Sequence, residues 1–209
     1  MAEPAIRPVE TRVLGIFFSS DRQFIVGSKG TWAIARRKQD SMAQLSIRVN
    51  ERMWKIIATP DTPLLYVLSN ELGLQGPRFG CGLAQCGSCS VLVEGVEMRS
   101  CVTLVGSVGS KSVTTLEGLP LWYARQEGLS KAPALHPVQQ AMIDEQALQC
   151  GYCYNGMIIK AAELLSKVPQ PSEAQIRSAM NGHLCRCGTY PRITKAIQRA
   201  SRMMPEVNK

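Results

Sequence analysis

Three cysteines fall within nine residues in the stretch CGLAQCGSC, which spans residues 81–89. Small residues separate Cys81, Cys86 and Cys89, and Cys101 follows after eleven further residues. Neighbouring cysteines on so tight a loop do not readily reach the geometry of a disulfide bond. Thiolates are, in contrast, good ligands for zinc and for iron. The pattern therefore predicts a metal centre whose ligands are these four cysteines.

The spacing C-x4-C-x2-C followed by a more distant cysteine is that of plant-type [2Fe–2S] ferredoxins. The glycines of this region, Gly80, Gly82 and Gly87, are expected to let backbone N–H groups turn toward the sulfurs. Such N–H groups stabilise the negative charge of a cluster. A four-cysteine zinc site is the alternative, although zinc ligands come more often as two separated C-x2-C pairs.

A second group of four cysteines lies in the C-terminal third of the chain, as Cys150-x2-Cys153 and Cys185-x-Cys187. This spacing taken alone fits either an iron–sulfur cluster or a zinc ion. All four cysteines lie next to predicted helix ends, where N–H groups favour an anion. The two groups use all eight cysteines, so none remains as a nucleophile. A disulfide scaffold is not expected, because such domains are usually small and secreted.

The composition excludes several functional classes. Lys and Arg number 24 against 16 Asp and Glu, which gives a formal net charge of +8. The basic residues are scattered and only Arg36-Arg37-Lys38 form a run, so we expect no nucleic-acid partner. No run of about 18 apolar residues is present, so we expect no insertion into a membrane. The sequence shows no paired carboxylates, Ser-His-Asp set or phosphate-binding glycine loop, so we expect no catalytic residue on this chain.

The first 41 residues contain no cysteine and no recognisable export signal. VLGIFF (13–18) is too short for a signal sequence, and no apolar stretch follows Arg36-Arg37. We therefore expect a cytoplasmic protein, or a periplasmic one that is exported together with a signal-bearing partner. Residues 1–41 are expected to be either an extension that contacts a partner or a stretch upstream of a translation start at Met42.

Residues 42–118 predict a small mixed domain of strands and one helix. Alternating apolar residues indicate strands, and turn residues separate them. Asp61 or Thr62 is expected to cap the helix, with Pro63 in its first turn. The predicted elements are two strands within 43–58 that turn at Asn50-Glu51, a helix over 60–73, a hairpin that turns at Glu94-Gly95, and a strand within 111–118.

Residues 119–135, which include Trp122-Tyr123, predict a linker on the surface. Residues 136–209 predict a helical domain, and its short connections favour an antiparallel bundle of four helices. His136 is expected to cap a helix or lie on the surface. Ser172 and Gln175 form a capping-box pattern. The helices are predicted over 136–148, 155–168, 172–182 and 190–204.

At the cysteines the sequence resembles a known family. GPRFGCGLAQCGSCSVLVEG, ALQCGYCYNGMI and NGHLCRCGTYPRI are similar to motifs of the iron–sulfur subunit of molybdenum hydroxylases, the xanthine dehydrogenase and aldehyde oxidase superfamily. The resemblance runs from about Met42 to about Met203, and it is strongest to small subunits of the isoquinoline 1-oxidoreductase and nicotinate dehydrogenase type. It implies an α+β chain in which a [2Fe–2S] ferredoxin-like β-grasp domain precedes a four-helix-bundle domain with a second [2Fe–2S] cluster.

The resemblance also implies a function. The chain would pass electrons from the molybdenum cofactor of a large catalytic subunit to a cytochrome c or a flavin subunit. Gln149 and Cys187 would contact the molybdopterin, which the large subunit mainly holds. The substrate would be an N-heteroaromatic compound or an aldehyde. His183 replaces a more usual Asn and Arg78 a frequent Lys, and neither is a ligand. The alternative is an interaction protein stabilised by two zinc sites of four cysteines each, without a redox role.

Overall fold

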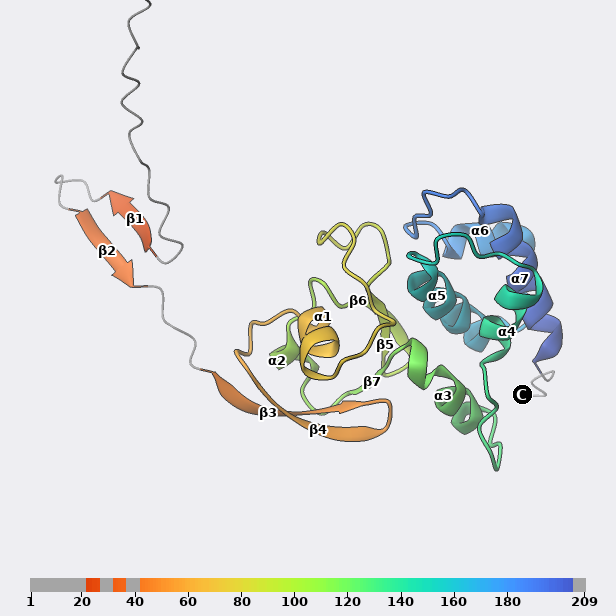
Figure 1. Ribbon diagram of the computed structural model, residues 1–209, viewed down its shortest axis with the longest axis horizontal. Coiled ribbons are helices and arrows are strands. Elements are labelled where there is room, and N and C mark those ends of the chain that lie inside the picture. The colour runs from red at the N-terminus through yellow and green to blue at the C-terminus, as the bar shows by residue number, and fades with distance from the viewer. Residues whose placement is uncertain (1–21, 27–31, 37–41, 205–209) are drawn as a thin grey trace, which may run out of the picture. The chain divides into compact units, whose positions relative to one another are not determined.

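The computed structural model describes residues 22–26, 32–36 and 42–204 (Figure 1). The chain divides into two units, residues 1–39 and 40–209. In the first unit, strands β1 (Arg22–Val26) and β2 (Trp32–Arg36) pair antiparallel. The rest of the expected extension over residues 1–41 lies outside the described residues. All features below belong to the second unit.

A five-stranded sheet forms the first part of this unit, in the order β4-β3-β7-β5-β6. Strands β3 and β7 run parallel, and the other neighbours pair antiparallel. Both predicted hairpins are confirmed, because Asn50-Glu51 and Glu94-Gly95 form their turns with positive φ at all four residues. Two-residue turns of that kind match the twist of the flanking strands. The strands are β3 (Ala43–Val49), β4 (Arg52–Ala58), β5 (Ser90–Val93), β6 (Val96–Arg99) and β7 (Ser112–Thr114).

The helix predicted over 60–73 is present but shorter, as α1 (Leu64–Tyr66) followed by a wider turn, η1 (Val67–Glu71). Pro63 stands at the N-cap rather than inside the first turn, and no side chain caps this end. The Thr62 hydroxyl bonds to the Thr59 hydroxyl at 2.9 Å instead. This segment covers one face of the sheet and, with α2 (Val105–Val108), packs on the buried side chains of β3, β4, β5 and β7.

The four predicted helices are confirmed, with ends that differ by a few residues. His136 caps α4, because its Nδ1 accepts from the Val138 N–H at 3.0 Å. It is buried, so the alternative that it lies on the surface is wrong. The Ser172–Gln175 capping box is also formed. The helices are α4 (Pro137–Asp144), α5 (Tyr154–Lys167), α6 (Glu173–Ala179) and α7 (Tyr190–Met203).

The prediction of a surface linker over 119–135 is wrong for its first half. The 3-10 turn η2 (Leu116–Gly118) leads directly into helix α3 (Leu119–Gln126). Leu119 and Tyr123 are buried, one helical turn apart, and Tyr123 packs on the ring of His136 with 4.9 Å between centroids. Gly118 and Pro120 suggested a loop, but proline is tolerated in the first turn of a helix.

Strand β5 joins the sheet to the helices because both of its faces are buried. Successive side chains of a strand point to opposite faces. Val91 and Val93 pack with α1 and η1, whereas Leu92 packs into the core of the helices, beside α5. The predicted α+β class is therefore confirmed. Within the described ranges, no helix combines the length and apolar character that a membrane span requires.

Candidate metal centres

Backbone N–H groups of the first cysteine loop converge on sulfur. The N–H groups of Leu83, Gln85 and Cys86 lie 3.3–3.4 Å from the Cys81 Sγ, and the Cys81 N–H lies 3.4 Å from the Cys86 Sγ. Cys89, at the end of the loop, contacts the thiol of Cys101. The loop therefore gathers the four cysteines of the first predicted group and turns N–H dipoles toward them.

Glycine is required where this loop passes closest to sulfur. A Cβ on Gly80 would lie 2.6 Å from the Cys86 Sγ, which is closer than real contacts allow. Gly82 and Gly87 have φ values of +68° and +82°, a region that residues with a Cβ seldom adopt. Glycine is therefore needed at Gly80 because of its contact with sulfur, and at Gly82 and Gly87 because of their backbone conformation.

The loop moves the pKa values of its thiols in opposite directions. Burial acts to raise the pKa of Cys81, but the N–H groups of Leu83, Cys86 and Gln85 outweigh it and lower that pKa from 9.0 to about 7. Burial raises the pKa of Cys89 to about 12. Because only a thiolate binds metal, Cys81 is ready to bind at neutral pH. Cys89 depends on the positive charge of the metal to lose its proton.

The second group of cysteines gathers at the N-terminal ends of α5 and α7. Cys153 is the N-cap of α5. Cys185 lies 3.3 Å from the hydroxyl of Thr189, the N-cap of α7. The Cys187 and Cys150 sulfurs are 3.5 Å apart, and Cys153 contacts Cys185. The four cysteines therefore meet as two sulfur pairs at these helix ends.

One thiol in this group is also easily ionised and another is not. Burial acts to raise the pKa of Cys185, but the hydroxyl and N–H of Thr189 outweigh it and lower that pKa to about 7. Burial, with the adjacent Cys185, raises the pKa of Cys153 to about 12. The two groups therefore share the same electrostatic arrangement on unrelated local structures.

The donor set fits [2Fe–2S] clusters. A zinc site needs four sulfurs at about 2.3 Å from one ion. A [2Fe–2S] cluster divides four thiolates between two irons. In this structure the cysteines meet as sulfur pairs, and backbone N–H groups point toward the Cys81 sulfur. The first loop has no space for a Cβ at Gly80. Both features agree with a [2Fe–2S] cluster.

Direct contacts join the two groups of cysteines. The Leu184 N–H donates to the Cys86 carbonyl at 2.9 Å. The Asn155 side chain, buried in the first turn of α5, donates to the carbonyls of Ser88 and Ser90 at 2.9 and 2.8 Å. Sequence reasoning missed Asn155, and its only signal was a position two residues after Cys153.

The two residues expected to contact the molybdopterin, Gln149 and Cys187, are both accessible to solvent. Gln149 is exposed beside the exposed Cys150, and Cys187 is partly exposed. Arg78 is also exposed, and its guanidinium lies 5.5 Å from the centre of the Tyr152 ring. The Tyr152 hydroxyl donates to a backbone carbonyl of the first loop, at Phe79.

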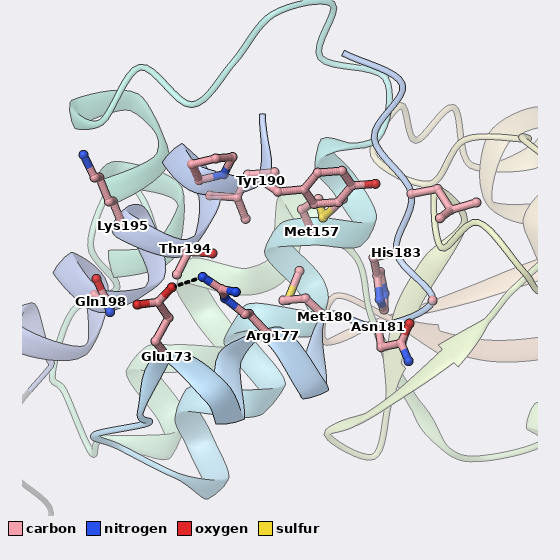
Figure 2. A pocket seen from close by; sticks show the side chains of 14 residues that line it. Met157, Glu173, Arg177, Met180, Asn181, His183, Tyr190, Thr194, Lys195 and Gln198 are labelled. Atoms are coloured by element: carbon pink, nitrogen blue, oxygen red, sulfur yellow. Dashed lines mark hydrogen bonds and ion pairs between the residues drawn. The ribbon is translucent and has the colours of Figure 1, made fainter. Parts of the chain in front are cut away.

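A cavity of about 680 Å³ lies beside the second group, between α5, α6 and α7 (Figure 2). Met180 contributes to its apolar wall, and Glu173 and Arg177, both on α6, form an ion pair along one side of it. His183, two residues before Cys185, also lines it. None of the eight cysteines lines this cavity, so it is separate from the candidate centres.

Comparison with known proteins identifies the family. A family model described as a [2Fe-2S] binding domain matches residues 126–198. A subunit of the nicotinate dehydrogenase of Pseudomonas putida is 50% identical over 157 residues, 75% of this chain and 94% of the relative. The alpha subunit of isoquinoline 1-oxidoreductase of Brevundimonas diminuta is 51% identical over 142 residues, 68% of this chain and 86% of the relative.

Solved structures agree. The chain matches a chain of quinoline 2-oxidoreductase from Pseudomonas putida 86 with a TM-score of 0.69 and 33% identity, over 78% of this chain and 95% of that one. Fold and site thus define an iron–sulfur protein of the oxidoreductase class. The chain belongs to the family of iron–sulfur subunits of molybdenum hydroxylases, which confirms the resemblance seen in the sequence motifs. The zinc-stabilised alternative is not favoured.

Proposed function

We propose that the chain is the electron-transfer subunit of a molybdenum-containing hydroxylase or dehydrogenase and binds two [2Fe–2S] clusters. The observation that carries this proposal is the division of all eight cysteines into two separate groups of four. Each cluster supplies transfer of one electron at a time. Cys81, Cys86, Cys89 and Cys101 would hold one cluster, and Cys150, Cys153, Cys185 and Cys187 the other.

The protein residues around each group would set two different reduction potentials. N–H groups directed at sulfur, burial and solvent exposure are the means by which a protein tunes a cluster. Three N–H groups lie against the Cys81 sulfur, whereas the Thr189 hydroxyl lies against that of Cys185. Different neighbours of this kind support separate potentials in one chain.

The family supports a division into domains. Residues 42–118 would form the ferredoxin-like β-grasp domain, and residues 136–209 the four-helix domain. Residues 119–135, with α3, would connect them. The two hydrophobic cores support this boundary only in part, because Leu92 and Leu119 pack with the helices.

The relatives also support a partner. The proteins named above are subunits of nicotinate dehydrogenase and isoquinoline 1-oxidoreductase. By analogy a large subunit would hold the molybdenum cofactor and carry out catalysis, and Gln149 and Cys187, both accessible, would contact the molybdopterin. The substrate would be an N-heteroaromatic compound or an aldehyde, and the acceptor a cytochrome c or a flavin subunit.

Metal analysis of the purified chain tests the two-cluster proposal. We expect about four iron and about four acid-labile sulfide per chain, with broad absorption beyond about 400 nm, because each [2Fe–2S] cluster contributes two of each. A colourless protein that holds two zinc ions would overturn the proposal.

Purification from the native source tests the partner. The chain should copurify with a larger molybdenum-binding subunit, and the isolated chain should not turn over substrate. Full turnover by the isolated chain would contradict the assignment of catalysis to the partner.

A further inference from the structure

Arg99, the last residue of β6, contacts both cysteine loops with one side chain. Its Nε donates to the carbonyl of Ala84, inside the first loop, at 3.2 Å. Its Nη2 donates to the carbonyl of Gly182 at 3.0 Å, three residues before Cys185. The side chain is only 15% exposed. A single guanidinium therefore bonds directly to the backbone of both loops.

The remaining nitrogen of the Arg99 guanidinium, Nη1, also contacts residues beside the two loops. Nη1 lies 2.8 Å from the His183 Nε2, donates to the Ser90 hydroxyl at 2.6 Å and forms an ion pair with Glu97. Because a guanidinium only donates, the His183 Nε2 can act toward Nη1 only as an acceptor. The His183 ring in turn packs against the first loop, since a Cβ on Gly87 would lie 2.4 Å from its Cδ2.

Arginine is specifically suited to this position. Its planar fork presents five donors in a fixed geometry, whereas lysine is a point charge on a flexible stem. The contacts of Arg99 leave from three different nitrogens in different directions. Glu97 offsets the positive charge nearby. No other residue type can make these three contacts from one planar group.

We infer that Arg99 is a positioning residue that fixes the separation of the two cluster-binding loops. The inference rests on the proposed two-cluster function. Magnetic coupling between two reduced clusters falls with the cube of their separation, and electron transfer between them falls more steeply. A residue that bonds to both loops therefore controls how efficiently one cluster reduces the other.

The test uses the complete complex with Arg99→Lys and Arg99→Met. Iron content is measured first, then the electron paramagnetic resonance splitting between the fully reduced clusters, then the rate of inter-cluster transfer after rapid reduction. We expect full iron in both variants. The splitting should decrease in Arg99→Lys, which keeps the charge, and be lost in Arg99→Met, with slower transfer in both.

Two controls separate geometry from charge. Arg125→Met removes the ion pair that the exposed Arg125 of α3 forms with Glu51 in the β3–β4 turn, and it should leave the splitting unchanged. Glu97→Gln alters the local charge but keeps the loop contacts of Arg99, so it should shift the potentials and keep the splitting. If Arg99→Met loses a cluster, the splitting in Arg99→Lys decides the question.

Failure of the positioning role and failure of the proposed function would give different results. Unchanged splitting and transfer rate in an iron-replete Arg99 variant would overturn the positioning role and leave the proposed function intact. A wild-type protein with no iron–sulfur signals would instead overturn the proposed function itself.

Discussion

The backbone N–H of Leu184 donates to the backbone carbonyl of Cys86 at 2.9 Å. Cys86 belongs to the first cysteine group, and Leu184 directly precedes Cys185 of the second. One hydrogen bond thus links a residue of one group to the neighbour of a residue of the other. The arrangement makes the two sites close neighbours although each has its own loop and its own ligands.

Substitution of a single cysteine should remove one cluster and leave the other in place. Cys86→Ser removes a thiolate from the first group and should remove or perturb that cluster while the second stays visible by electron paramagnetic resonance. Cys153→Ser should do the reverse. Partially reduced wild-type protein should show two separable signals, because the surroundings of Cys81 and Cys185 differ. Loss of both signals from either change would show that the sites do not fold independently.

Gly80→Ala should affect the first site through sterics alone. The added Cβ would lie 2.6 Å from the Cys86 Sγ, so the sulfur or the loop must move. We expect loss of roughly half the iron, the share of one of two [2Fe–2S] clusters. Metal analysis and the visible spectrum measure the loss of iron.

Gly73→Ala is the matched control for Gly80→Ala. A Cβ there meets no atom within 4 Å, but φ is +67°. It should lower stability by about 1 kcal/mol through backbone strain and keep all the iron. Equal iron content in both variants would contradict the steric explanation.

The sequence was sufficient where local patterns decide the structure. Alternation with Asn50-Glu51 and Glu94-Gly95 predicted both hairpins, because turns with positive φ favour such residues. The helical period predicted α5 and α7 nearly to their ends. The spacing of the cysteines predicted two groups, and the structure brings Cys89 close to Cys101 and Cys153 close to Cys185; their role as cluster ligands stays a prediction.

The sequence was insufficient where contacts between distant segments decide the structure. Helix α3 was missed because Gly118 and Pro120 indicate a loop, while burial of Leu119 and Tyr123 against the helical core stabilises a helix. Arg99 looked like an ordinary charged residue at the end of a strand. Its bonds to Ala84 and Gly182 depend on tertiary packing that no local pattern records.

Glu163→Gln should destabilise the protein in a pH-dependent way. The buried Glu163 carboxylate bonds to Lys160 and Lys167 at 2.6 Å and accepts the N–H of Glu97 at 3.2 Å. Burial acts to raise the pKa of Glu163, but these partners outweigh it and lower that pKa below 4.5. Its contribution is therefore complete above pH 4.5 and is lost as the pH falls through the lower folded-state pKa.

Urea unfolding at pH 7 and at lower pH measures this contribution. At pH 7 we expect Glu163→Gln to lose about 1.5–3 kcal/mol, the range for hydrogen bonds to charged groups. The difference from wild type should shrink below pH 4.5. Glu173→Gln, at an exposed pair with Arg177, should cost at most about 0.5 kcal/mol and serves as the control. A Glu163→Gln variant as stable as wild type at pH 7 would contradict the prediction.

Gly156→Ala tests the contact between α5 and the first cysteine loop. Inside a helix, alanine is more favourable than glycine by about 0.5–1 kcal/mol, so local propensity alone predicts stabilisation. A Cβ on Gly156 would, however, lie 2.1 Å from the carbonyl oxygen of Gly87 and 3.2 Å from the His183 Cδ2. The first of these atoms is a backbone atom of the buried Gly87, which cannot move as a flexible side chain does. Overpacking of this kind costs about 1–3 kcal/mol or more, so the steric effect exceeds the gain in helix propensity.

We therefore expect Gly156→Ala to lower the melting temperature and to weaken the magnetic coupling between the two clusters, because α5 and the loop must separate. Ser166→Ala, at an exposed position of the same helix, should change the stability by at most about 0.5 kcal/mol and leave the coupling unchanged. Calorimetry and electron paramagnetic resonance on the same samples measure both quantities. If Gly156→Ala raised the melting temperature with full coupling, helix propensity would dominate, and the close approach of Gly156 to Gly87 would not limit how the loop packs.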